Sequence, residues 1–133
     1  MGGLRLGSVR VENTILWYIR LTLDCRYLQG IMMAHTVEGM QEAGVQATAK
    51  HWIANEQELN RETMSADVPS RVLRELYVWP FMDAVHSNVA AVMCSYNKIN
   101  GTWACESDAV MNKLLKDELG FRGYIMSDWN GNA

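Results

Sequence analysis

Apolar residues recur along the chain with a helical period, and short apolar runs follow the helical stretches. The pattern in residues 27–43 predicts a helix that turns Met33 and Val37 to its buried face and ends before Gly44. Residues 45–50 then have the length and composition of a short strand. The first two predicted elements of the chain are therefore a helix and a strand.

A second helical pattern begins after Pro69. It places Leu73, Leu76 and Tyr77 on one face, which we expect to be buried. Pro80 interrupts the pattern, because proline lacks a backbone N–H and clashes with the preceding turn. The sequence therefore predicts a kink or a second helix start at this position.

Two further apolar runs, at residues 89–96 and 124–128, also have strand length. Between them, Ser107 or Asp108 can cap a helix whose apolar face contains Met111, Leu114, Leu115 and Leu119. Continuous apolar runs are typical of strands that are buried on both faces, which indicates a parallel sheet with helical crossovers. A doubly wound sheet and a (β/α)8 barrel both fit this alternating order.

Composition and charge narrow the class of protein. The 133 residues, 49% apolar and 20% charged, suit one globular domain or part of a larger one. A net charge of −3 with scattered Lys and Arg argues against a nucleic-acid partner, and no apolar run is long enough to span a membrane. No GxGxxG, Walker or CxxC pattern occurs, so we expect neither a cofactor nor a metal.

Unusual polar and aromatic residues fall where the three predicted strands end. They form a cationic pair, a Tyr-Asn pair and an Asp-Trp pair: Lys50, His51, Tyr96, Asn97, Asp128 and Trp129. The carboxyl ends of parallel strands face the same side of a sheet, so these pairs are expected to converge. A buried carboxylate needs hydrogen-bond donors, and Lys50, His51 and Tyr96 can supply them around Asp128.

This mixture of residue types favours a sugar-binding site. Aromatic faces pack against the apolar faces of pyranose rings, while Lys, His and Asn side chains bind hydroxyl groups. A carboxylate at a strand end, here Asp128, can attack an anomeric carbon as a nucleophile. The alternative from the residues alone is that Asp128 caps a helix that follows the strand.

Two of the three cysteines bracket a polar turn. Cys94 and Cys105 fit either a disulfide across a short loop or two buried thiols, and their spacing does not decide between these.

Four stretches of the chain resemble one enzyme family. The stretches ATAKHWIANEQELNR, LRELYVWPFMDAV, VMCSYNKINGTWACES and LLKDELGFRGYIMSDW resemble glycoside hydrolase family 3, above all its fungal secreted β-glucosidases. The resemblance runs from about Tyr27 to Trp129 and implies a partial (β/α)8 TIM barrel, roughly its second half. It also implies hydrolysis of terminal non-reducing β-D-glucosyl residues, as in cellobiose, cello-oligosaccharides and aryl glucosides.

The resemblance also assigns roles to single residues. The Asp of the SDW motif, here Asp128, is expected to be the catalytic nucleophile, and Lys50 and His51 are expected to bind sugar hydroxyls. The remaining expected substrate-binding residues are Met93, Tyr96 and Trp129. In the secreted members the cysteines that flank this loop are bridged, so the resemblance implies a Cys94–Cys105 disulfide and a secreted parent enzyme.

Two parts of the family pattern do not match this chain. Residues 1–26 do not resemble the family, and we expect them to derive from an unspliced intron or a frame error. Residues 27–133 are expected to be part of the family's N-terminal barrel domain. The family's acid/base residue lies in a following α/β sandwich domain, which we expect to lie outside this chain.

Two alternative functions stay open at this point. The parent enzyme can be a β-xylosidase of the same family, or the chain can be a catalytically dead fragment that acts at most as a sugar-binding module.

We predict that the 133-residue chain alone does not hydrolyse an aryl β-glucoside, because only one of the two carboxyl groups that the reaction needs is expected in it. The measurement is release of the phenol from an aryl β-glucoside by the purified chain. Turnover above that of a heat-treated sample contradicts the prediction.

Overall fold

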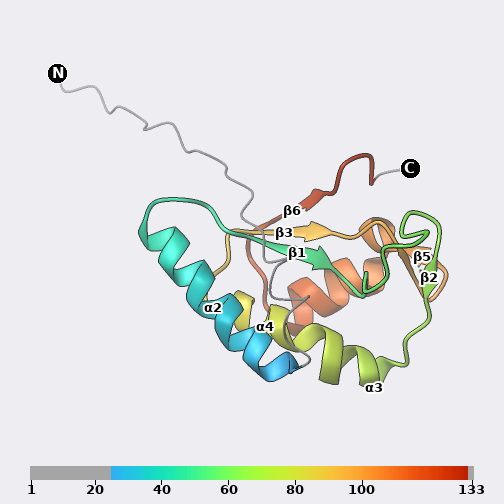
Figure 1. The fold of residues 1–133 in the computed structure, drawn as a ribbon, viewed down its shortest axis with the longest axis horizontal. Coiled ribbons are helices and arrows are strands. Elements are labelled where there is room, and N and C mark those ends of the chain that lie inside the picture. Colours follow the sequence, from blue (N-terminus) through green and yellow to red (C-terminus); the bar gives the residue numbers. More distant parts are fainter. Residues whose placement is uncertain (1–24, 132–133) are drawn as a thin grey trace.

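Three parallel strands and the helices between them form the centre of the chain (Figure 1). The structure is a computed structural model that describes residues 25–131. Its elements are α2 (Arg26–Glu42), β1 (Thr48–Trp52), β2 (Ser65–Ala66), α3 (Ser70–Val72), the π-helix η1 (Leu73–Val78), α4 (Trp79–His86), β3 (Ala91–Cys94), β4 (Lys98–Ile99), β5 (Thr102–Trp103), the 3-10 turn η2 (Ala104–Glu106), the π-helix η3 (Ala109–Glu118) and β6 (Tyr124–Ser127).

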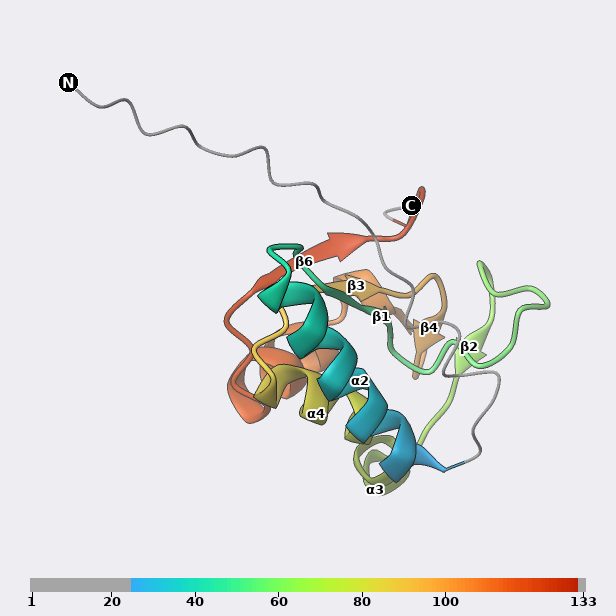
Figure 2. The same cartoon turned by 60° about the vertical axis from the view of Figure 1, so that its left-hand side comes forward.

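The main sheet has the strand order β1-β3-β6, and both neighbouring pairs are parallel. In both views α2, α4 and η3 lie on one side of this sheet, with α2 packed beside α4 (Figures 1 and 2). A second small sheet joins β2, β4 and β5 beyond the carboxyl ends of β1 and β3 (Figure 1). The predicted α/β class, with parallel strands connected by helices, is confirmed.

Trp52, the last residue of β1, connects three elements of the core. It is fully buried, and its indole packs edge-on against Phe81 of α4 with ring centroids 4.9 Å apart. The indole N–H also donates to the carbonyl oxygen of Val110 in η3, at 3.2 Å. Further large side chains that are fully buried are Val37, Ile53, Val92 and Leu115. The end of β1 is therefore fixed from the helical side of the sheet.

The buried face of the second helical region differs from the prediction at one position. Leu73 is buried and Tyr77 is half-buried, but Leu76 is 47% exposed and Val78 takes its place in the core. The reason is the π-helical turn, in which hydrogen bonds join residues five apart, so that Leu73 and Val78 share a face. The predicted second helix start is confirmed, since α4 begins at Trp79 with proline in its first turn.

Two predicted strands are corrected by the structure. The first was expected at residues 45–50, but β1 begins at Thr48 and runs on to Trp52, because a turn at Gly44 with φ of +82° is followed by an irregular link. The last strand was expected to be buried on both faces, and only the central strand β3 is. In β6, Tyr124 is 42% exposed, because β6 lies at the edge of the three described strands with β3 as its neighbour.

The expected boundary between residues 26 and 27 falls in the first turn of α2. Arg26 begins this helix, and its guanidinium group pairs with Glu56 at 3.3 Å. The expectation for residues 1–24 lies outside the described part of the chain. Among the described helices, none is both long enough and apolar enough to cross a membrane.

We predict that Gly123→Ala destabilises the protein by about 1–3 kcal/mol, the usual cost of overpacking. A Cβ at position 123 would overlap the carbonyl oxygen of Ala90 and the ring of Phe121. The matched control is Gly39→Ala at an exposed position of helix α2, where a Cβ meets nothing within 4 Å and should raise stability slightly. Thermal denaturation measures both, and equal melting temperatures for the two variants would contradict this packing.

Candidate active site

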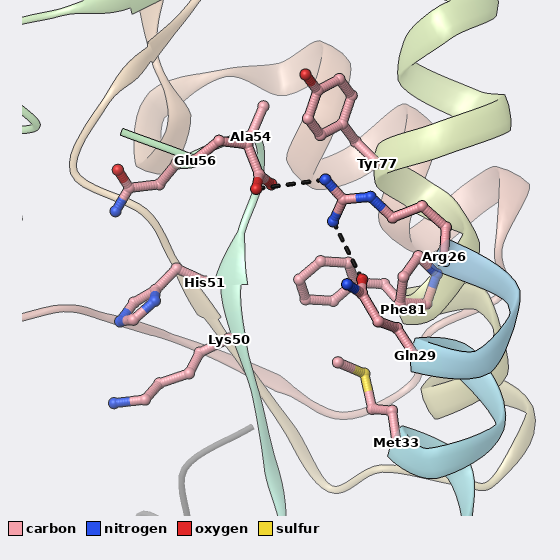
Figure 3. Close-up of a pocket in the computed structure, with 11 residues that line it drawn as sticks. Arg26, Gln29, Met33, Lys50, His51, Ala54, Glu56, Tyr77 and Phe81 are labelled. Atoms are coloured by element: carbon pink, nitrogen blue, oxygen red, sulfur yellow. Dashed lines mark hydrogen bonds and ion pairs between the residues drawn. The ribbon is translucent and has the colours of Figure 1, made fainter. Parts of the chain in front are cut away.

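The carboxyl end of β1 turns two consecutive basic residues, Lys50 and His51, to one side of the strand. Side chains in a strand normally alternate between faces. Here β1 advances three residues, from Ala49 to Trp52, while β3 advances two, so β1 contains a bulge. The peptide bond between Lys50 and His51 is cis, and Figure 3 shows both side chains extending to the same side of β1.

His51 meets the carboxylate that follows β6. Its Nε2 lies 3.0 Å from Oδ2 of Asp128, and both side chains are only 9% exposed. The other carboxylate oxygen, Oδ1, accepts a hydrogen bond from the backbone N–H of Trp129 at 2.8 Å. The structure thus brings together the predicted His51 and Asp128, and each oxygen of the buried carboxylate has a nitrogen within hydrogen-bonding distance.

Tyr96 is the third group at this carboxylate. Its pKa is raised, first because burial disfavours the phenolate and then because of the negative charge of Asp128 and a hydrogen bond to it. The phenol therefore stays protonated at neutral pH and can donate to Asp128. This agrees with the expectation that a strand-end carboxylate gathers donors from the neighbouring strand ends.

Arg61 is a nearby cation that sequence reasoning missed. Its guanidinium carbon lies 4.9 Å from the centre of the Tyr96 ring, within the range of a cation–π contact. The same guanidinium group pairs with Glu58 at 2.9 Å. Arg61 belongs to the stretch between β1 and β2, which has no apolar period, so its place could be found only from the motif that contains it.

An open cleft of about 310 Å³ lies beside Tyr96 and Trp129. The other residues that line it are Glu62, Thr63, Trp103, Asn130 and Gly131. Trp129 is 84% exposed, whereas the ring of Trp103 is partly covered by the Lys98 ammonium group at 4.5 Å. The cleft therefore has two indole walls. Trp103 lies in a stretch without a regular period, and the sequence analysis did not single it out.

Two further predicted site residues, Met93 and Lys50, are not among the described residues that line the cleft. Met93 is buried in β3 and paired in register with Met126 of β6. Lys50 lies next to His51 and points to the same side of β1 (Figure 3). Both lie on strands that lead to the candidate site.

A second cavity, between β1 and the helices, is much smaller. It has about 40 Å³, and Lys50 and His51 line it together with Met33, Phe81 and the Arg26–Glu56 pair (Figure 3). Small-ligand sites usually have about 300 Å³ or more. The cleft beside Trp129 reaches that size, so it is the better candidate for a substrate site.

A disulfide closes the loop that contains Tyr96 and Trp103. It joins Cys94 at the end of β3 to Cys105 in η2, with their Cα atoms 5.3 Å apart. In the chain-entropy model, a disulfide that closes a loop of this length stabilises the folded state relative to the unfolded chain by about 3 kcal/mol. The bond fixes the strand end from which Tyr96 reaches Asp128.

We predict that Asp128→Asn lowers the pKa of Tyr96 toward its ordinary value of about 10, because the substitution removes a negative charge. Glu62→Gln should lower it less, because Glu62 contributes least among the causes of the shift. Tyrosine 13Cζ shifts, assigned with Tyr96→Phe, report the titration.

The raised pKa also links Tyr96 to stability. The contribution of Tyr96 to the free energy of unfolding is fully present below its unfolded-state pKa near 10. It is lost as the pH rises from there through the folded-state pKa. A larger pKa decrease in Glu62→Gln than in Asp128→Asn would contradict the arrangement described above.

Comparisons with known proteins identify the family of this chain. The model of the Glycosyl hydrolase family 3 N terminal domain matches residues 24–132. Beta-glucosidase cel3A of Pyricularia oryzae is 70% identical over 104 residues, which cover 78% of this chain and 14% of that protein.

Solved structures give the same result. Beta-D-glucoside glucohydrolase from Trichoderma reesei superposes with a TM-score of 0.80 and 61% identity, covering 81% of this chain and 15% of that one. Beta-glucosidase 3B from Thermotoga neapolitana, in complex with glucose, superposes with a TM-score of 0.77 and 42% identity. The match covers 78% of this chain and 15% of that one. The chain thus spans about one seventh of the length of these relatives. By this match to its N-terminal domain, the chain belongs to glycosyl hydrolase family 3.

Proposed function

We propose that this chain supplies the nucleophile and part of the sugar-binding site of a retaining β-glucosidase. The observation that carries the proposal is the buried Asp128 carboxylate at the rim of the sheet, within reach of His51, Tyr96 and the Trp129 N–H. The relatives that match the chain are named β-glucosidases, and one of them is solved with glucose.

In the proposed reaction, ionised Asp128 attacks the anomeric carbon of a terminal β-D-glucosyl unit. The new C–O bond to the carboxylate forms as the glycosidic C–O bond breaks, and the leaving oxygen takes a proton from a second carboxyl group. Water, deprotonated by that same group, then releases glucose from the ester. The second carboxyl group is proposed to lie outside this chain, about 5–5.5 Å from Asp128, as retention requires.

The neighbouring residues suit this task. His51 and Trp129 N–H hold the two carboxylate oxygens, which fixes the direction of attack. Tyr96 remains a neutral phenol beside the nucleophile because of its raised pKa, and Arg61 covers its ring. Lys50 and His51 are proposed to bind sugar hydroxyls, Met93 to line the sugar pocket, and Trp129 to pack against a pyranose ring.

The rest of the proposal concerns the whole protein. The open sheet β1-β3-β6, with its helices on one side, suits a segment of a (β/α)8 barrel. An α/β sandwich domain beyond this chain would supply the acid/base residue. The Cys94–Cys105 disulfide favours a secreted protein, because such bonds persist mainly in oxidising compartments.

A hybrid enzyme tests the proposal: cel3A of Pyricularia oryzae in which the 104 matching residues of this chain replace the corresponding segment. We expect the hybrid to hydrolyse cellobiose and aryl β-glucosides. An activated 2-deoxy-2-fluoro-β-glucoside should inactivate it and label Asp128, because the fluorine slows hydrolysis of the ester. Peptide mapping locates the label.

Two variants of the hybrid sharpen the test. Asp128→Asn should lower kcat by about 10⁴-fold, while Asp117→Asn, an exposed carboxylate on η3, should leave it unchanged. Label on any residue other than Asp128 overturns its role as nucleophile. A folded but inactive hybrid overturns the proposed function, and faster turnover of aryl β-xylosides than of β-glucosides overturns the proposed substrate.

A further inference from the structure

The residues on either side of Tyr96 bond to the end of β1 rather than to the cleft. Ser95 donates its backbone N–H to the carbonyl oxygen of Trp52 at 2.6 Å and its hydroxyl to that of Ile53 at 3.2 Å. Asn97 Nδ2 donates to the same Ile53 carbonyl, also at 3.2 Å. We propose that Asn97, assisted by Ser95, is a positioning residue that holds His51 against Asp128; this rests on the proposed function.

The strand ladder cannot hold this part of β1 by itself. Lys50 and His51 lie within the bulge, where the register of β1 with β3 is interrupted. Past the bulge, the backbone is held instead through the carbonyl groups of Trp52 and Ile53. The Ile53 carbonyl is two residues from His51, so its position sets where the imidazole ring can reach.

Asn97 is suited to this role by its burial. It is fully buried, and its amide donates to two carbonyl oxygens, those of Ile53 and Lys98. The backbone carbonyl oxygen of Asn97 accepts a hydrogen bond from the Ala104 N–H at 3.0 Å. A buried hydrogen bond is strong and costly to break, so Asn97 joins the end of β1 firmly to the loop closed by the disulfide.

The Ser-Tyr-Asn sequence therefore supplies one donor to the nucleophile, Tyr96, and positions a second, His51. Tyr96 reaches Asp128 directly, whereas its two neighbours face the opposite way and fix the strand end that carries His51. His51 Nε2 then lies 3.0 Å from Asp128 Oδ2. A change at residue 97 should act on the reaction through His51 and not through the cleft.

The test is a double-mutant cycle in the hybrid enzyme. Asn97→Asp keeps the side-chain size but removes both amide donors, and we expect kcat/KM for an aryl β-glucoside to fall about tenfold or more. In a His51→Ala background the same substitution should lower kcat/KM less than about twofold, because the residue through which Asn97 acts is gone. A residue that serves only stability would cause the same loss in both backgrounds.

Two further variants complete the design. Leu115→Ala, fully buried on η3, should lower the melting temperature but leave kcat/KM unchanged in either background. If Asn97→Asp fails to fold, Ser95→Ala removes one donor to the same carbonyl and enters the same cycle. Equal losses with and without His51, or no loss, overturn the proposal. The unsubstituted hybrid's activity and labelling of Asp128 test the proposed function separately.

Discussion

The arrangement around the sheet depends on supplying one buried carboxylate with hydrogen-bond donors. Asp128 is only 7% exposed, and a buried charge is costly unless donors surround it. Those donors come from three places: His51 within the bulge in β1, Tyr96 after β3, and the Trp129 N–H after β6. The bulge, the disulfide-closed loop and the parallel register all serve to bring these three strand ends together.

Much of this arrangement could be predicted from the sequence, because the order of the elements determines where the strand ends lie in a parallel sheet. Apolar runs alternating with helical patterns predict parallel strands, and parallel strands end at one side of the sheet, so His51, Tyr96 and Asp128 had to converge. What the pattern could not predict depends on neighbours in space. The exposure of Tyr124 follows from the edge position of β6, and the exposure of Leu76 follows from a π-helical turn.

The residues that the sequence analysis did not identify show the same limit of prediction from sequence patterns. Arg61 and Trp103 lie in stretches without regular period, where residue type predicts neither burial nor direction. Asn97 was noticed as a sugar-binding candidate, yet its amide faces the protein interior and binds the backbone of β1. Whether a polar side chain serves the ligand or the backbone depends on which way it turns, and sequence spacing does not determine that for a loop.

The contrast between two adjacent residues has a further consequence. Asp128 is buried and Trp129 is almost fully exposed, so the border between protein interior and water runs through a single peptide unit. Under the proposed function, a sugar ring laid on the indole would move that border outward and place the carboxylate deeper inside a water-free region. Electrostatic contacts strengthen as water leaves. The ligand itself would thus lower the local dielectric constant around the glycosidic bond that is proposed to break there.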